Sequence, residues 1–252
     1  RYIVYQSNAT NLVASDTNTS GDVFLYDRDL QTTTRISVTS AGAQATGGES
    51  AQPAISADGL YVAYEADATN LVAGDTNTAK DVFLYDVTAL TTTRISVTSA
   101  GAQVFFGQSA DPAISGNGRY ISYSSYSDQL VPNDLNLNYD IFLYDRNLGR
   151  TSRVTVNDAG VEENSGALHP DISADGRYIV YETFATNLDT GDTNAANDII
   201  MYDSVLDTTM RVSVDEDGNT NETKAESRNA ANSGNGRNSS DYSEAATRVH
   251  ND

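Results

Sequence analysis

The sequence predicts an all-β fold, a β-propeller of four-stranded antiparallel blades with about 59 residues per blade. Three observations lead to this prediction. One unit returns four times along the 252 residues, its apolar residues alternate with a period of two, and turn-forming residues separate the short apolar runs. We therefore expect four blades, followed by a degenerate fifth partial repeat.

The repeat is clearest in the segment NATNLVASDTNTSGDVFLYD, at residues 8–27. It returns at 67–86, 126–145 and 184–203. The first Asp of its DTN-like block therefore recurs at intervals of 59, 59 and 58 residues, at Asp16, Asp75, Asp134 and Asp192. A period of this length is typical of structural repeats that stack on one another.

The elements of one unit follow from residues 53–98. They are, in order, a short strand at 53–56, a hairpin turn at 57–59, a second strand at 61–65, a polar loop at 68–80, a third strand at 82–85 and a fourth at 92–98. The turn contains a glycine, which adopts positive φ without strain. The fourth strand is rich in β-branched residues, which favour sheets. No stretch has the pattern of a long helix.

The run Pro-x-Ile-Ser-x-Asp/Asn-Gly-x-Tyr appears as PAISADGLYVAY at 53–64, PAISGNGRYISY at 112–123 and PDISADGRYIVY at 170–181. It resembles the repeat of the TolB-like (WD40-like, PD40) β-propeller family. The NLVxGDTNxxxDVFLYD pattern that follows is similar to a subgroup found in bacterial secreted or envelope proteins. The resemblance implies an extracellular or envelope (periplasmic) location. One difference is that Ile replaces the family's usual aromatic residue at Ile55, Ile114 and Ile172.

The two ends divide the chain into blades at 1–214 and a C-terminal degenerate repeat or tail at 215–252. The first unit begins at its second strand, residues 1–6. Residues 228–233 are the candidate for the missing innermost strand, although Asn232 stands where other units have Ile. Three alternatives stay open: the tail closes the ring weakly, a neighbouring chain or further blades complete the sheet, or the tail is disordered.

Composition excludes several classes of function. The chain has 35 acidic and 15 basic residues, a formal charge of −20, which disfavours nucleic acid and anionic membrane surfaces and favours cations. No apolar run is long enough for a transmembrane helix, so we expect no membrane insertion. The absence of cysteine excludes disulfides, thiolate zinc sites and cysteine nucleophiles.

An Asp-x-Asn-x-x-x-Asp motif in each unit predicts one Ca²⁺ site per loop. Ca²⁺ takes six to eight oxygen ligands, and alternate positions of a tight loop can turn toward one centre. The predicted ligands, with the fifth position contributing its carbonyl, are Asp16, Asn18, Ser20 and Asp22; Asp75, Asn77, Ala79 and Asp81; Asp134, Asn136, Asn138 and Asp140; and Asp192, Asn194, Ala196 and Asp198. The alternative is a metal-free turn, because Asp and Asn side chains also bond backbone N–H groups two residues on.

Two other residue types recur with the repeat. We expect the tyrosines to pack between blades, with sugar stacking as the alternative, at Tyr5, Tyr64, Tyr123, Tyr181, Tyr26, Tyr85, Tyr144 and Tyr202. We expect the fourth-strand arginines to pair with aspartates of the DTN loop or the YD pair, with an anion site as the alternative, at Arg35, Arg94, Arg153 and Arg211.

Catalytic motifs are absent from the sequence. His169 and His250 have no recognisable partner set, and neither G-x-S-x-G nor H-E-x-x-H occurs. The resulting prediction is a non-enzymatic, calcium-binding propeller that serves as a structural or protein-interaction scaffold and self-associates through open strand edges. The rival predictions are a lectin-like propeller with one carbohydrate site per blade and a glycan-active enzyme with a site at the central tunnel.

Overall fold

The protein is described by a computed structural model that covers residues 1–192, 196–214, 227–232 and 239–243. These residues form strands and turns without any helix, so they contain no helical segment able to cross a membrane. The strands in chain order are β1 (Tyr2–Ser7), β2 (Asp22–Asp27), β3 (Thr32–Arg35), β4 (Ser50–Ile55), β5 (Tyr61–Ala66), β6 (Asp81–Asp86), β7 (Thr91–Arg94), β8 (Ser109–Ile114), β9 (Tyr120–Ser125), β10 (Asp140–Asp145), β11 (Arg150–Arg153), β12 (Ala167–Ile172), β13 (Tyr178–Thr183), β14 (Asp198–Asp203), β15 (Thr208–Arg211), β16 (Ser227–Asn232) and β17 (Ser239–Ser243).

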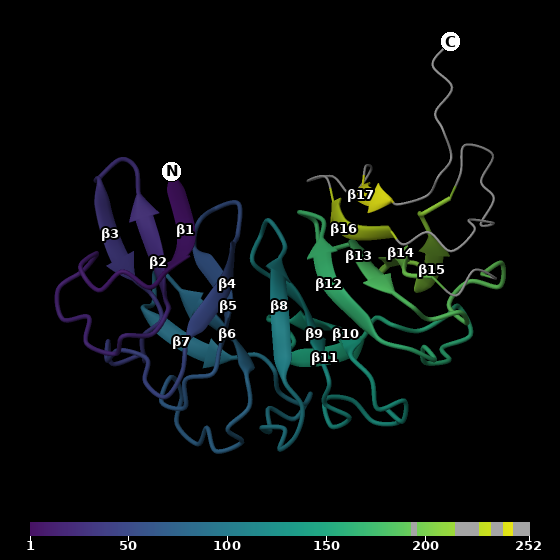
Figure 1. Ribbon diagram of the computed structural model, residues 1–252, viewed down its shortest axis with the longest axis horizontal. Coiled ribbons are helices and arrows are strands. Elements are labelled where there is room, and N and C mark those ends of the chain that lie inside the picture. The colour runs from purple at the N-terminus through teal and green to yellow at the C-terminus, as the bar shows by residue number, and fades with distance from the viewer. Residues whose placement is uncertain (193–195, 215–226, 233–238, 244–252) are drawn as a thin grey trace, which may run out of the picture.

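Within each repeat, strands that follow one another in the chain pair antiparallel, so each repeat forms one sheet. The first sheet is β1-β2-β3, the second β4-β5-β6-β7, the third β8 to β11 and the fourth β12 to β15, and β16 pairs with β17. The sheets stand side by side in an open arc, from the purple first sheet to the yellow β16–β17 pair (Figure 1). The predicted propeller of four-stranded antiparallel blades, with its degenerate fifth repeat, is confirmed.

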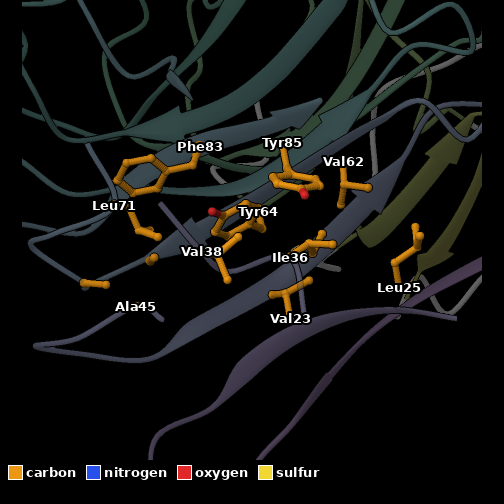
Figure 2. Packing of buried hydrophobic residues seen from close by; sticks show 12 residues of the cluster. Val23, Leu25, Ile36, Val38, Ala45, Val62, Tyr64, Leu71, Phe83 and Tyr85 are labelled. Carbon is orange, nitrogen blue, oxygen red and sulfur yellow. The ribbon is translucent and has the colours of Figure 1, made fainter. Parts of the chain in front are cut away.

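The hydrophobic core lies between consecutive sheets. Between the first two sheets, Val23 and Ile36 of the first unit lie near Val62 and Tyr64 of the second, and Phe83 belongs to the same cluster beside Leu71 (Figure 2). Equivalent clusters join the second sheet to the third and the third to the fourth. The predicted packing role is confirmed for three of the tyrosines, which are fully buried at Tyr64, Tyr123 and Tyr181. The middle strands β6 and β10 are buried along nearly their whole length, because the sheets that contain them pack against a neighbour on both faces.

A hydrogen bond at the outer strands joins each four-stranded sheet to the sheet before it. The same threonine of the outermost strand donates its hydroxyl to a carbonyl of the preceding unit, in the pairs Thr92–Val38, Thr151–Val97 and Thr209–Val156. Because the repeat places this bond at each junction in the described chain, the sheets are locked in one relative orientation.

The innermost strands β4, β8 and β12 each contain a β-bulge immediately before a proline. The register against the next strand shifts there, and the residue before the proline has a positive φ of 48° at Gln52, 52° at Asp111 and 52° at His169. A bulge redirects a side chain out of the regular alternation. These three positions consequently face the central axis of the arc, where their side chains line one cavity.

At the C-terminal end, β16 pairs with β17 and not with β1. The register of this pair also shifts in the middle, as it does between β4 and β5, so β16 is the counterpart of the innermost strands. The first sheet has three strands, and in the described residues no strand pairs with the inner edge of β1. The predicted tail residues at 215–226, 233–238 and 244–252 lie outside the described residues.

Candidate functional site

The first DTN loop is organised around an arginine. The Nη1 of Arg35, from β3, lies 3.4 Å from the carboxylate of Asp16 and 3.5 Å from that of Asp22. The Asn18 side-chain oxygen accepts the Ser20 N–H at 3.0 Å, and its amide group donates to Asp22 at 3.3 Å. The guanidinium therefore occupies the place between the two carboxylates, and the asparagine closes the turn.

The arginine also contacts both loop aspartates in the second and fourth units, and in the third unit it contacts the first aspartate and Glu162. The predicted pairing of the fourth-strand arginines with the loop aspartates is confirmed by contacts of 3.1 Å in Arg94–Asp75, 3.1 Å in Arg94–Asp81, 3.3 Å in Arg153–Asp134, 3.4 Å in Arg211–Asp192 and 2.9 Å in Arg211–Asp198. The Asx turn also recurs, with 3.1 Å from Ala79 N to Asn77 and 2.9 Å from Asn138 N to Asn136. Asn194 lies outside the described residues.

The loop geometry bears directly on the predicted calcium ligands. In the first, second and fourth loops the first and seventh positions meet around a guanidinium. The described asparagine oxygens of the first three loops turn toward the backbone. Within the described part of the chain, no three side chains among His, Asp and Glu gather closely enough to hold a metal ion. Calcium binding stays a prediction, and the metal-free turn accounts for every described contact of these asparagine oxygens.

The third loop differs from the first two in charge. Where Gln44 and Ala45 stand in the first unit, the third has Glu162 and Glu163. Glu162 contacts Arg153 at 2.8 Å. Glu163 is buried, its Oε2 accepts the Thr183 hydroxyl at 2.9 Å, and its Oε1 has no hydrogen-bond partner. This loop holds more negative charge than its arginine balances.

The pKa values of carboxyl groups in the third loop reflect its excess negative charge. Burial, together with the nearby Asp140 carboxylate, raises the pKa of Asp134 to about 7. Burial also raises the pKa of Glu163 well above its usual range. A carboxyl group that resists ionisation in the folded protein is one whose charge the surroundings do not fully compensate. The third loop is thus the electrostatically least satisfied of the described carboxylate loops.

A second cluster lies on the central axis, where the repeats differ from one another. Gln52, Asp111 and His169 occupy the same repeat position, and with the prolines that follow them they line a cavity of about 370 Å³. The cavity is open to solvent. Three different polar side chains therefore converge there once, in contrast to the loop sites that recur in each unit.

His169 makes the most specific contacts of this axial cluster. Its Nδ1 lies 2.5 Å from the Oε1 of Glu182, whose Oε2 accepts the Asn197 amide at 2.7 Å. Its Nε2 lies 3.9 Å from the Asp111 carboxylate, and burial raises the pKa of Asp111. A buried carboxylate that holds one ring nitrogen fixes the orientation of the imidazole. The expectation that His169 has no partner set is wrong. His250 lies outside the described residues.

The neighbouring axial position holds an ion pair. Lys80 Nζ lies 2.6 Å from Glu65 Oε1, and the Oε2 of Glu65 accepts the backbone N–H of Asp111 at 2.9 Å. Lys80 therefore turns away from the DTN loop in which it sits and toward the axis. In the sequence, these axial residues stand out because the aligned repeats differ at this position, with Gln52, Asp111 and His169. The spacing of the repeats does not by itself show that the three side chains converge.

Comparisons with known proteins find the fold and no closer relationship. No family model matches the chain, and no curated protein matches it. Among solved structures, the chain is similar to TolB from Acinetobacter baumannii, with a TM-score of 0.52, 15% identity and coverage of 86% of this chain and 41% of that protein. The chain thus spans less than half the length of that structure.

Two further structures are similar at lower scores. A TolB-type protein from Agrobacterium tumefaciens has a TM-score of 0.47 and 14% identity, over 77% of this chain and 56% of that one. A prolyl endopeptidase has a TM-score of 0.49 and 11% identity, over 84% of this chain and 28% of that one. Because identities this low show the fold alone, the conclusion concerns architecture: the chain has the TolB-like β-propeller fold.

Proposed function

We propose that this chain is a non-enzymatic propeller scaffold that binds protein partners, including further copies of itself, through added strands. The observation that carries the proposal is the inner edge of β1, with which no strand of the described residues pairs, whereas the second, third and fourth sheets each have a fourth strand at this place. An unpaired strand edge presents N–H and C=O groups that accept another strand. The hydrogen bonds between neighbouring sheets and the contacts of the axial cluster are compatible with a rigid protein that presents the free edge of β1.

The register identifies the free groups of β1. Tyr2 to Ser7 pair with Asp27 to Asp22, and the Arg28 N–H donates to the Arg1 carbonyl at 3.1 Å. Antiparallel bonding alternates along a strand, so Ile3 and Tyr5 bond to β2, whereas the N–H groups of Tyr2, Val4 and Gln6 point away from it. In the second sheet the equivalent groups pair with the innermost strand β4.

The occupant that we propose is the β16 segment of another copy. β16 has the bulged register of the innermost strands, but it belongs to a sheet with only two described strands. Exchange of such a strand between copies produces head-to-tail contacts, which build rings or open filaments. The acidic surface, with a net charge of −20, keeps other copies apart except where backbone pairing compensates the repulsion.

The test is the oligomeric state across a concentration series, measured by sedimentation velocity. Val4→Pro removes an outward N–H without removing a bond to β2, and it should leave a monomer; the matched Val4→Ala variant keeps the N–H and should assemble like the parent. A monomeric parent at the highest concentration, or assembly that Val4→Pro leaves unchanged, contradicts the proposal. Thermal melting of both variants checks that they fold.

We place this scaffold outside the cytoplasm of a bacterial cell. The support is the TolB-like repeat pattern in the sequence and the similarity of the fold to TolB. Fractionation of a bacterium that expresses the complete natural gene tests the location. Recovery in the cytoplasmic fraction contradicts it.

The calcium prediction is carried forward as a proposal for the third loop alone. Its support is the pair Glu162 and Glu163, which adds two carboxylates to Asp134 and Asp140, and the unpartnered Oε1 of the buried Glu163. Binding requires Arg153 to move aside and the carboxylates to approach one another, because they are too far apart here to share an ion. Ca²⁺ provides the compensating charge that the arginine alone does not.

The decisive variant restores the residues of the first unit. Glu162→Gln with Glu163→Ala reproduces Gln44 and Ala45 in the third loop. Calorimetric titration with Ca²⁺ should show one site per chain in the parent and none in this variant. Equal binding by both proteins, or no binding by the parent, contradicts the proposal and leaves the arginines as the loops' only cations.

A second candidate function has one specific observation behind it. The Glu182–His169 pair leaves the Nε2 of an oriented imidazole facing the axial cavity, beside Asp111. This arrangement suits a general base. A panel of aryl glycosides and peptide anilides, assayed with the parent and with His169→Gln, tests this candidate: turnover that the substitution abolishes supports it, and no turnover by the parent rejects it.

A further inference from the structure

A cavity lies between the second and third units, and the repeat alignment identifies the residues at the same positions between the first and second units and between the third and fourth. We call these three places the first, second and third grooves in chain order. In the repeat alignment, Glu49, Asp67 and Lys80 occupy three positions of the first groove. The second groove has Gln108, Tyr126 and Tyr139 at these positions. Two aromatic rings and a neutral amide therefore replace all three charged side chains. The change removes charge from one groove of a strongly acidic protein.

The second groove forms a cavity of about 420 Å³, lined by Thr78, Ala79, Gly107, Gln108, Tyr126 and Tyr139. The two tyrosine rings lie 5.4 Å apart, centre to centre, with their planes inclined by 56°. Tyr126 is 47% exposed. A cavity of a few hundred cubic ångströms with aromatic walls and a few polar groups has the properties of a small-ligand site.

Exposed apolar residues extend this surface along the chain. Phe105 and Phe106, which directly precede Gly107 of the groove, are 65% and 72% exposed. Thr46 and Gly47 occupy these positions in the first unit. Large apolar side chains that are exposed together mark an interaction site, because core packing does not require them there.

The wall that carries Tyr126 is held in place by close backbone packing. Gly107 has a φ of +88°, and a Cβ atom at this position would lie 2.5 Å from the Ser127 nitrogen. The Tyr126 N–H donates to the Gln108 carbonyl at 2.9 Å. The position of Tyr126 is thus set by the fold, which lowers the entropic cost of binding.

Part of the backbone beside the groove is already hydrogen-bonded within the fold. The Ser109 N–H donates to the Lys80 carbonyl at 2.8 Å, and the Ala79 N–H donates to the Asn77 side chain at 3.1 Å. Together with the Tyr126–Gln108 bond, these contacts occupy several main-chain groups beside the cavity. The side-chain groups available for recognition there are the aromatic faces, the Thr78 hydroxyl and the Gln108 amide.

We propose that the groove between the second and third units binds a neutral oligosaccharide. A pyranose ring has one face of C–H groups, which are attracted to the electron-rich face of an aromatic ring, and a rim of hydroxyls that pairs with neutral hydroxyl and amide groups. The lining provides both and includes no charged side chain. The net charge of −20 disfavours anionic sugars. Phe105 and Phe106 offer further stacking surface to a chain of several rings.

The inference goes beyond the strand-mediated scaffold and is independent of it. It also predicts one sugar site per chain, where the repeat alone suggests one per blade. The first groove is charged, and the third has Phe184 and Asn197 in place of the two tyrosines. Neither neighbouring groove combines two aromatic rings with a neutral lining, so the second groove is the one of the three that has both.

The experiment titrates the full chain with hexasaccharides of cellulose, xylan, mannan, chitin and amylose, and with hexagalacturonate as the anionic control. Near-ultraviolet difference absorbance reports the binding through tyrosine alone, because the chain has 15 Tyr and no Trp. Calorimetry gives the stoichiometry. We expect a neutral hexasaccharide to bind with one site per chain, and hexagalacturonate to bind more weakly or not at all.

Variants identify the groove. Tyr126→Ala should weaken binding by about tenfold or more, and Tyr126→Phe should retain most of it, because the ring is kept. Phe184→Ala is the matched control from the third groove, with a side chain of similar exposure, and should bind like the parent. No binding of any neutral hexasaccharide, tighter binding of hexagalacturonate, or full binding by Tyr126→Ala overturns the proposal.

Discussion

Replacement of a single loop arginine tests the electrostatic basis of the fold. The perturbation is Arg94→Leu in the second unit, where the side chain of Arg94 is 8% exposed. Its Nη1 lies 3.1 Å from each of Asp75 and Asp81, and its Nη2 donates to Gln103 at 2.8 Å. Leucine has an apolar side chain of comparable bulk, so the substitution removes chiefly the cation.

The expected magnitude follows from what remains behind. The side chains of Asp75 and Asp81 are 3% and 1% exposed, so the substitution leaves two uncompensated carboxylates away from water. Loss of one partner of a buried ion pair costs about 3–5 kcal/mol. The matched control is Arg119→Leu, whose pair with Asp145 is more exposed and therefore contributes less to stability.

Equilibrium unfolding in urea measures both variants. Arg94→Leu should lower the unfolding free energy by several times as much as Arg119→Leu does. Adding Asp75→Asn and Asp81→Asn to Arg94→Leu should recover part of the loss, because the unpaired charges are then absent. Near-parental stability of Arg94→Leu alone would refute the reasoning that the arginine is the cation of this loop.

Three further predictions concern the described sheets. Arg1 holds the pKa of Asp27 down to about 2 in the folded protein, whereas the unfolded value is near 4. The stability that this pair provides is therefore present above about pH 4 and is lost as the pH falls toward about 2. The melting temperature of Asp27→Asn should depend less on pH than that of the parent between about pH 4 and 2. Gly118→Ala should destabilise the protein in thermal melting, because φ is +65° and the added Cβ would lie 2.3 Å from the Tyr61 ring; near-parental melting contradicts this packing. Tyr123→Ala should cost about 3–5 kcal/mol in urea unfolding, because the ring is fully buried beside Phe142; a loss below about 1 kcal/mol would show that the ring does not hold the sheets together.

Much of the fold was predictable from the sequence, because residues that pack against a neighbouring sheet recur at the same position of each repeat. Positions that face a neighbouring sheet, such as Tyr64 and Tyr123, recur in each unit, and alternation with period two identifies the strands between turns. The arginine pairing was also predictable, since Arg94 and the loop aspartates recur together. The sequence did not separate a metal from an arginine as the loop cation, because both choices use the same carboxylates at the same spacing.

The axial cluster was not predictable for a geometric reason. Gln52, Asp111 and His169 converge because the bulge before each proline gives the preceding residue a positive φ. The residue before a proline ordinarily favours an extended conformation with negative φ. An extended strand gives no reason for these side chains to meet, and the contact of His169 with Glu182 depends on the bulge as well as on the pairing of β12 with β13.

The distribution of differences among units separates scaffold from site. Residues that are identical between units make the contacts that each junction needs, as Thr92 and Thr151 do. Some of the residues that differ lie at the axis and in the second groove, as Asp111 and Tyr126 do. Since a duplicated unit begins with the same side chain at each copy of a position, a polar or aromatic group that occurs once marks a place where the units have diverged. The oligosaccharide site that we propose gives a reason for this divergence in the second groove, and it separates Tyr126 and Tyr139 from the buried tyrosines that recur with the repeat.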